Sequence, residues 1–349
     1  MGYHQKQTPA SIMENTYTLL STKMLAIGYS KQKHLHQNLM LQLKAGDMVG
    51  LIGPNGGGKS TLIRTLAGLQ PALEGTIYIK NTPLNKLKPT QRAKQIAVVL
   101  TDSISTQSLT VRQLVEMGRF PHTNWVGKLQ EKDNQMVAKC IEQVHLTHKA
   151  DRFYNELSDG EKQRVMIAKA LAQDTPIIFL DEPTAHLDLP NTIEIMLLLQ
   201  HLAVSTQKAI LLSTHELEVA LQICDKLWLL TAKGVQRGIP EDIILGGYIE
   251  KTFTPHQFYF DDSIGNFRIK YATNQYSIQL KGEPCKQLYW TQRSLQRLGY
   301  TINQKADCSI TLLQTDPLKW EFANPLYTEQ FYTLENLLDS LQEYLKKHG

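Results

Sequence analysis

Apolar runs alternate with helical stretches along the first two thirds of the chain. The runs are short and lie next to turn-forming residues, which is typical of strands buried on both faces of a parallel sheet. Residues from about 60 to 69 and most of 109–171 are expected to be helical. Strands that alternate with helices predict a doubly wound parallel sheet, and hence an α/β fold. The expected strands are 48–53, 75–80, 176–180, 209–213 and 226–230.

The pattern changes after about residue 250. Residues 251–265 turn aromatic and polar, which marks a domain boundary. Further on, apolar and polar residues alternate over 276–281, as in a half-exposed strand, and leucines mark one helix face over 334–345. We expect a first domain over 1–255 and a small α+β domain over 256–349. The small domain is expected to contain roughly two strands, a helix, two strands and a helix, and to regulate the first domain or support its dimer.

The composition is that of a two-domain globular protein. The chain has 349 residues, of which 42% are hydrophobic and 20% charged. The net charge of +4 is small and spread along the chain, so it gives no reason to expect a nucleic-acid partner. The four cysteines lie far apart and are expected to be reduced thiols. No apolar run is long enough to span a bilayer and no signal core is present, so any work at a membrane requires docking onto a separate membrane protein.

A glycine-rich segment follows the first buried strand and precedes a helix. Glycines let backbone N–H groups approach phosphate oxygens, and the start of a helix adds the positive end of its dipole. Lys59 can reach the β- and γ-phosphates of ATP, and the Ser60 hydroxyl can bind Mg²⁺. The strand before and the helix after make a chance glycine-rich turn the weaker interpretation. The residues of this predicted phosphate loop are Gly53, Pro54, Asn55, Gly56, Gly57, Gly58, Lys59, Ser60 and Thr61.

Two carboxylates end the apolar strand at 176–180. Carboxylates at the C-terminal end of a parallel strand face the ligand crevice of an α/β sheet. Adjacent residues on a strand point in opposite directions, so two different roles are natural. Asp181 would hold Mg²⁺, directly or through water, and Glu182 would polarise the attacking water. Alone, the pair could be a solvated turn; together with the phosphate loop, that interpretation is the weaker one.

The segment 157–164, Leu-Ser-Asp-Gly-Glu-Lys-Gln-Arg, opens a helix through a predicted capping box of Ser158 and Glu161. It also resembles the LSGGQ-type signature of ABC ATPases, and the order and spacing of the motifs match that family over about 17–250. The resemblance implies a P-loop NTPase with a RecA-like parallel-sheet core, an antiparallel β subdomain and a helical subdomain. It also implies a homodimer that sandwiches two ATP molecules, in which Ser158 and Gly160 bind the γ-phosphate of the ATP held by the partner.

Three more residues take roles from the same resemblance. Asp188 matches the acid of the D-loop, and His215, which follows a strand, matches the switch histidine. Tyr29 matches the aromatic residue that stacks on adenine. Structural interpretations stay open for the last two, because a lone histidine is more often structural and a tyrosine at a strand end is common.

The sequence departs from the family pattern at two positions. Asp159 replaces a glycine of the signature, and an acid beside phosphate is unfavourable unless its side chain points away. Thr101 stands where the family has a glutamine that links Mg²⁺ and the attacking water to the transporter contact. Thr101 or Asp102 is expected to replace it.

The segment 117–122, Met-Gly-Arg-Phe-Pro-His, looks like a stretch in the ATPases of iron-siderophore, haem and vitamin B12 importers. An ordinary turn between helices is the alternative. The resemblance implies an ATPase on the cytoplasmic face of the inner membrane, docked onto permease subunits near residues 101–125, with a substrate-binding protein as an indirect partner. The alternative from another class is a soluble ABC ATPase that acts in nucleic-acid or ribosome transactions. The short interval from Lys59 to Ser158 excludes the long coiled-coil insertion of chromosome-maintenance ATPases.

Overall fold

The computed structural model describes residues 17–30, 33–100, 108–123, 128–253, 258–262, 264–270 and 276–348. The chain divides into two compact units. The first comprises Met1–Thr254 with Phe260–Asn266, and the second comprises Pro255–Tyr259 with Phe267–Gly349.

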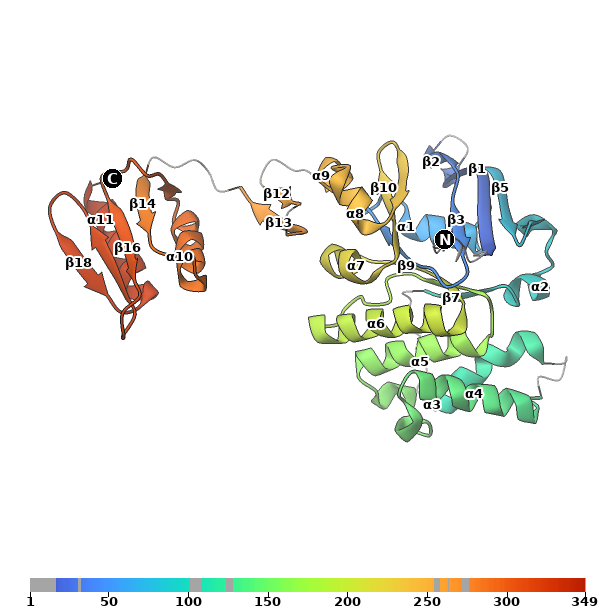
Figure 1. Cartoon of the computed structure of the whole chain (residues 1–349). Helices are drawn as coiled ribbons and strands as arrows, with labels where there is room; N and C mark the ends of the chain where they lie inside the picture. The colour runs from blue at the N-terminus through green and yellow to red at the C-terminus, as the bar shows by residue number, and fades with distance from the viewer. Residues whose placement is uncertain are drawn as a thin grey trace, which may run out of the picture. The chain divides into compact units, whose positions relative to one another are not determined.

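A six-stranded sheet forms the centre of the first unit (Figure 1). Its order is β11-β10-β4-β9-β8-β7; the strands from β10 to β7 run parallel, and β11 pairs antiparallel with β10. Strands β4, β8 and β9 are buried along their whole length, which explains their continuous apolar sequences and confirms the predicted parallel sheet. The bounds are Met48–Ile52 (β4), Ile96–Val99 (β7), Ile177–Leu180 (β8), Ala209–Ser213 (β9), Lys226–Thr231 (β10) and Gly234–Gly238 (β11).

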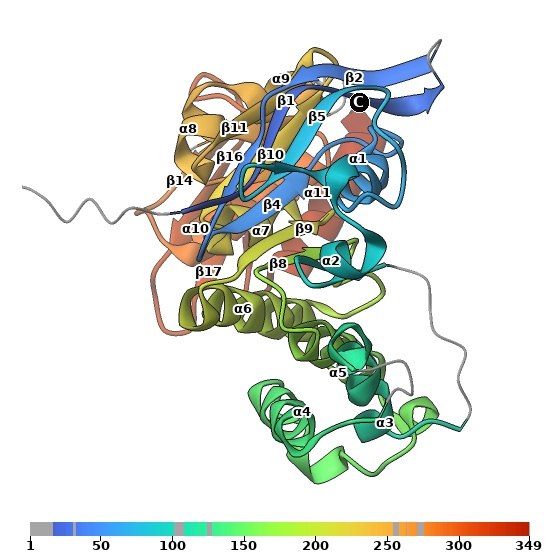
Figure 2. The same ribbon diagram turned by 90° about the vertical axis from the view of Figure 1, so that its right-hand side faces the viewer.

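A second, antiparallel sheet has the order β2-β1-β5-β6, with β3 also pairing with β1. Figure 2 shows β1, β2 and β5 beside one another. One hydrophobic core joins the two sheets: it contains Leu20 and Ile79 from the antiparallel sheet, and Leu51 and Phe179 from the central sheet. The bounds are Thr18–Ser30 (β1), Lys33–Leu39 (β2), Gln42–Lys44 (β3), Glu74–Ile79 (β5) and Thr82–Pro83 (β6).

Helices cover the central sheet and build a helical region beside it. Figure 1 shows α5 and α6 below the sheet, with α3 and α4 further out. Helices α3, α4 and α5 contact one another, and α5 also contacts α6 and β7. The α-helical bounds are Lys59–Leu66 (α1), Pro89–Ala93 (α2), Val111–Glu116 (α3), Glu131–Gln143 (α4), Asp159–Ala172 (α5), Leu189–Thr206 (α6), Leu217–Ile223 (α7), Pro240–Leu245 (α8) and Tyr248–Phe253 (α9).

Short 3-10 segments connect several of these helices. They are Leu84–Lys86 (η1), Met117–His122 (η2), Thr147–Lys149 (η3) and Tyr154–Glu156 (η4). The helix predicted over about 60–69 is shorter than expected. It ends at Leu66, because Gly68 adopts a φ of 69° and turns the chain out of the helix.

The second unit contains a five-stranded sheet of order β15-β14-β16-β17-β18 and two helices. Strand β14 runs parallel to β15 and β16, and β17 and β18 continue antiparallel. The core between sheet and helices includes Ile278, Leu295, Phe322, Leu337 and Leu341. The bounds are Ser277–Lys281 (β14), Lys286–Arg297 (α10), Thr301–Ile302 (β15), Ser309–Leu313 (β16), Lys319–Ala323 (β17), Thr328–Phe331 (β18) and Leu334–His348 (α11), preceded by a hairpin of Phe258–Asp261 (β12) and Asn266–Ile269 (β13).

The number of strands predicted between the two helices of this unit was wrong. Four strands, rather than two, lie between α10 and α11. Strand β15 has two residues, and β18 is an exposed edge with a single buried residue, Phe331. Neither strand has the apolar alternation that a half-buried strand shows, so sequence pattern alone gives no signal for them.

Candidate functional site

The predicted phosphate loop connects β4 to α1 and turns sharply at its glycines. Gly56 and Gly58 have φ values of 74° and 95°, in the left-handed region that glycine adopts without strain. Gly53 is needed for a different reason, because a Cβ there would lie 2.7 Å from Cβ of Leu230 on β10. The loop therefore keeps its backbone open toward the start of α1, where N–H groups are free of intrahelical partners.

Lys59 folds back over this loop. Its Nζ donates to the carbonyl oxygens of Gly53 at 3.1 Å and of Pro54 at 3.4 Å. Burial lowers the pKa of Lys59, and the nearby carboxylates of Glu182 and Asp181 oppose that shift. The ammonium group is thus held at the loop that would surround a phosphate.

Asp181 lies at the end of β8 and is tied to two hydroxyl groups. Ser60 Oγ donates to Asp181 Oδ1 at 3.1 Å, and Ser213 Oγ, at the end of β9, donates to the same oxygen at 2.7 Å. Asp181 and Ser213 are both buried. A hydroxyl and a carboxylate so close together form a set of hard oxygen donors, the kind that Mg²⁺ prefers.

Glu182 and His215 form a pair at the mouth of the site. Nε2 of His215 lies 2.6 Å from Oε1 of Glu182, and the Glu182 N–H donates to Ser213 Oγ at 2.8 Å. Glu182 has a φ of 52°, an uncommon value for a residue other than glycine and one that clusters at functional sites. The chain thus turns at Glu182, so that its carboxylate meets His215 while that of Asp181 meets Ser60.

Lys59, Ser60, Glu182 and His215 line one hollow of about 400 Å³, and Asp181 is joined to it through its hydrogen bond with Ser60. Tyr29 lies at its edge with 66% of its surface exposed, and the Lys33 ammonium sits 5.6 Å from the centre of its ring. The ring is therefore accessible for stacking on a planar base. The residues that line the hollow are Tyr29, Asn55, Gly56, Gly57, Gly58, Lys59, Ser60, Thr61, Glu182 and His215.

Among the described residues that line this hollow, Ser158 and Gly160 are not present. Both lie at the start of α5. The predicted capping box is present, because the Glu161 N–H donates to Ser158 Oγ at 3.4 Å and the Ser158 N–H donates to Glu161 Oε2 at 3.1 Å. Lys149 also pairs with Glu161. Asp159 points outward, since its side chain is 72% exposed and pairs with Lys162 at 3.2 Å. The acid that replaces the signature glycine thus leaves the helix start open.

Asp188 caps α6 and is linked to the start of α5 through Asn191. Asp188 Oδ1 accepts hydrogen bonds from the Asn191 N–H at 3.0 Å and from Asn191 Nδ2 at 2.7 Å. A Cβ at Gly160 would lie 2.9 Å from Asn191 Oδ1, so this glycine allows α5 and α6 to approach closely. Thr101 and Asp102, expected to replace the missing glutamine, lie outside the described residues.

Sequence reasoning missed His36, which supports the phosphate loop from β2. Its Nε2 lies 2.8 Å from the carbonyl oxygen of Gly57, and the residue is 8% exposed. Its ring also lies close to Gly58, where a Cβ would be 3.7 Å from His36 Cδ2. A single histidine on a strand carries no local signal of a contact to a loop 21 residues away.

The segment 117–122 does more than turn between two helices, because it anchors the end of α5. Buried Arg119 pairs with Asp133 at 3.0 Å and donates to the carbonyl oxygen of Ala172 at 2.7 Å. His122 Nε2 lies 2.9 Å from the Gln173 carbonyl oxygen. Gly118 lies so close to α5 that a Cβ there would collide with the backbone. Glycine, arginine and histidine in this spacing thus fasten η2 to the last turn of α5.

Comparison with known proteins gives two family matches. Residues 36–185 match the family described as ABC transporter, and residues 275–342 match the family described as Iron ABC transporter C-terminal domain. Over 253 residues, the chain is 34% identical to an uncharacterized ABC transporter ATP-binding protein of Methanocaldococcus jannaschii. The match covers 72% of this chain and 87% of that protein. The chain belongs to the ABC transporter ATP-binding proteins. It is therefore the ATPase type of transporter subunit, and its cassette binds ATP.

Other relatives of this ABC ATPase are named for import. The petrobactin import ATP-binding protein FpuD of Bacillus anthracis is 36% identical over 226 residues, which is 64% of this chain and 82% of that protein. The iron(3+)-hydroxamate import ATP-binding protein FhuC of Bacillus subtilis is 36% identical over 201 residues, which is 58% of this chain and 74% of that protein. These names do not support the alternative of a soluble ATPase in nucleic-acid or ribosome transactions.

Solved structures give the same family for the first unit. A dimeric bacterial ABC transporter cassette superposes with a TM-score of 0.55 at 27% identity, and the match covers 64% of this chain and 99% of that one. Among the described residues of the present chain, no helix has the length and apolar character required to cross a membrane.

Proposed function

We propose that this ABC ATPase powers a membrane importer of iron-siderophore, haem or cobalamin-type chelates. The observation that carries the proposal is the convergence of Lys59, Ser60, Glu182 and His215 on one hollow at the carboxyl ends of parallel strands, with Asp181 hydrogen-bonded to Ser60. The names of the petrobactin and hydroxamate relatives support the class of cargo, and so does the match to the iron transporter C-terminal domain.

In this proposal, the phosphate loop binds the ATP phosphates through its backbone N–H groups and the start of α1. Lys59 exchanges its contacts to Gly53 and Pro54 for the β- and γ-phosphates, and Tyr29 stacks on adenine. Ser60 and Asp181 hold Mg²⁺, for which their oxygen donors fit. When bound, Mg²⁺ offsets phosphate charge that develops during transfer.

Glu182 is the proposed base that orients and polarises the attacking water. Its carboxylate lies beside the hollow rather than on the Asp181 side, so it can accept a proton without competing for the metal. His215 now holds Glu182 Oε1 and is proposed to contact the γ-phosphate once nucleotide is bound. The Glu182–His215 contact then positions the base relative to the phosphate.

Ser158, Gly160 and Asp188 are proposed to act across a homodimer. Their place outside the hollow of their own chain supports this division, because each site then needs residues from two copies. The capped start of α5 presents N–H groups and the positive end of its dipole, which suit the γ-phosphate of the partner's ATP.

Permease subunits are proposed to dock near residues 101–125, at the cytoplasmic face of the inner membrane, with a substrate-binding protein contacting the permease alone. In the described part of this segment, Phe120 is 57% exposed while its neighbour Arg119 is buried against α5. A docked permease would thus touch Phe120 and act on α5 through Arg119 and Gly118. Thr101 or Asp102 is proposed to link this contact to Mg²⁺.

The test is uptake of a labelled ferric siderophore, haem or cobalamin by cells that carry Glu182→Gln. This variant should bind ATP, stop turnover and abolish uptake, because an amide cannot accept the proton of the attacking water. Glu218→Gln, an exposed substitution on α7, is the matched control and should leave both activities intact. Near-normal hydrolysis in Glu182→Gln would refute the assigned base. Normal uptake of all three cargo classes in a strain lacking this chain would refute the cargo class.

A further inference from the structure

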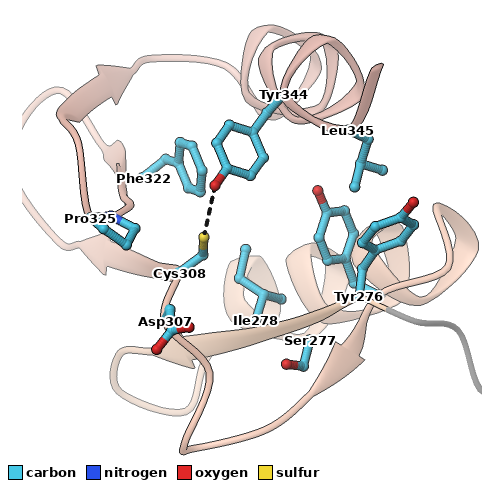
Figure 3. Close-up of a pocket in the computed structure, with 10 residues that line it drawn as sticks. Tyr276, Ser277, Ile278, Asp307, Cys308, Phe322, Pro325, Tyr344 and Leu345 are labelled. Carbon is cyan, nitrogen blue, oxygen red and sulfur yellow. Dashed lines mark hydrogen bonds between the residues drawn. The ribbon is translucent and has the colours of Figure 1, made fainter. Parts of the chain in front are cut away.

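The second unit contains a pocket whose lining includes no residue of the nucleotide site. Its volume is about 260 Å³. Its walls come from the start of β14, the residues before β16, the end of β17 with the turn after it, and the last turns of α11 (Figure 3). The lining residues that matter below are Tyr276, Tyr300, Asp307, Cys308, Phe322 and Tyr344.

Aromatic rings form two pairs in this wall. Tyr276 and Tyr300 lie with ring centres 6.2 Å apart, and Phe322 and Tyr344 meet edge to face at 5.7 Å. Figure 3 shows Tyr276 and Phe322 on opposite sides of the pocket, with Tyr344 reaching in from α11 and Ile278 between them. Phe322 and Tyr300 are buried, so the half-buried Tyr276 and Tyr344 offer the accessible ring surface of the pocket.

The described lining of the pocket carries formal charge of one sign, which is negative. Asp307 is the single charged residue among the described residues that line the pocket, and no lysine, arginine or histidine is among them. Contact with Cys308, 3.8 Å from its hydroxyl, raises the pKa of Tyr344, with a smaller contribution from burial, and burial raises the pKa of Tyr300. Both phenols are therefore neutral near pH 7, so the carboxylate of Asp307 supplies the formal charge of the described lining.

This combination selects against two ligand classes. An anion would meet Asp307 with no compensating cation from the described lining. A purely apolar molecule would bring no charge to balance the Asp307 carboxylate. An organic cation satisfies both features, because aromatic rings attract ammonium groups within about 6 Å of their centres. The volume is sufficient, since a cavity of about 150 Å³ already accepts a benzene-sized molecule.

We propose that this pocket binds a small methylated ammonium compound of about the size of choline, with the rings of Tyr276 and Tyr344 against the cation and Asp307 balancing its charge. The site lies in the iron transporter C-terminal domain and is separate from the residues of the nucleotide site. Binding there would make this unit a receptor for a small solute.

The test is a titration of the full chain with choline chloride, followed by calorimetry and by broadening of the choline methyl signal in NMR. The comparison ligand is the neutral analogue of choline in which carbon replaces nitrogen, because it has the same shape without the charge. Choline should bind about tenfold more tightly than this analogue, the ratio expected for cation–π contacts to two partly exposed rings. Equal affinities, or no choline binding at about 10 mM, would overturn the proposal.

Variants locate the site. Tyr344→Leu and Tyr276→Leu should each weaken choline binding about three- to tenfold, because each removes one ring from the wall. Tyr332→Leu is the matched control: this exposed tyrosine lies outside the pocket and should leave the affinity unchanged. Asp307→Asn should weaken binding, whereas Asp339→Asn on α11 should not. Two ring variants at separate positions keep the test valid if one fails to fold. Choline affinity that is indifferent to both ring variants would refute this pocket as the site.

Discussion

Replacing Arg119 by methionine should strongly destabilise the helical region of the cassette. Arg119 Nε and Nη2 each lie 3.0 Å from Asp133 Oδ1, and Nη1 donates to the Ala172 carbonyl oxygen at 2.7 Å. Methionine keeps much of the apolar stem but removes all of these contacts. It leaves the Asp133 carboxylate buried without its cation and the end of α5 without its donor.

The burial of the pair sets the size of the effect. The side chains of Arg119 and Asp133 are 7% and 2% exposed, so water cannot replace the lost partner. Removing one member of such a pair costs about 3–5 kcal/mol. Arg112→Met is the matched control, because Arg112 and Asp151 are 3.4 Å apart with side chains 43% and 89% exposed. Exposed pairs of this kind contribute at most about 1 kcal/mol.

Urea unfolding followed by circular dichroism, with hydrogen exchange of α4 and α5 amides, measures the difference. The double variant Arg119→Met with Asp133→Leu should recover much of the loss, since it leaves no unpaired charge. If Arg119→Met loses no more stability than Arg112→Met, the buried pair does not hold this region together and the reasoning fails.

Three other perturbations have defined outcomes. Ser158→Arg should abolish hydrolysis but leave nucleotide binding by the monomer intact, and loss of that binding in a fluorescent-nucleotide titration would contradict a role across the dimer. His36→Leu should raise the KM for ATP about fivefold with kcat nearly unchanged, because one hydrogen bond to the loop is worth about 1 kcal/mol; His36→Gln should recover part of the loss, and an unaltered KM in His36→Leu would show that the loop keeps its shape alone. The hydrogen bond from the Gln130 N–H holds the pKa of Asp133 below its usual range, and Arg119 makes a smaller contribution in the same direction. The stability from Asp133 is therefore complete above the unfolded pKa of about 4 and is lost as the pH falls through the lower folded value. Thermal unfolding down to about pH 3 should show this loss in the parent chain, and the Arg119→Met/Asp133→Leu variant should not show it.

The central sheet and the hollow could be predicted because each rests on a local pattern. Continuous apolar runs predicted β4 and β8. The loop after β4 leads to Lys59, and Asp181 directly follows β8, so both strands end near groups suited to phosphate and Mg²⁺. Parallel strands bring their carboxyl ends to one edge of the sheet, so neighbouring motifs meet without further information. The proposed roles of these residues remain predictions.

Contacts between distant segments could not be predicted in this way. Arg119 reaches Ala172 across 53 positions, and His36 reaches Gly57 across 21. Neither contact changes the hydrophobic pattern of its own segment, because each replaces water around a polar group by a backbone carbonyl elsewhere. Strands β15 and β18 were missed for a related reason: their pairing satisfies backbone groups, while their side chains contribute little to the core.

Helix α5 is fastened at both of its ends. At its start, Gly160 lies against Asn191, which Asp188 holds at the start of α6; at its end, Arg119 and Gly118 fix the last turn to η2. With 14 residues and a rise of about 1.5 Å each, α5 is about 21 Å long. A helix held at both ends in this manner moves as a rigid body. A displacement of exposed Phe120 would therefore move Ser158, about 21 Å away, and change the orientation in which the start of α5 contacts a second molecule.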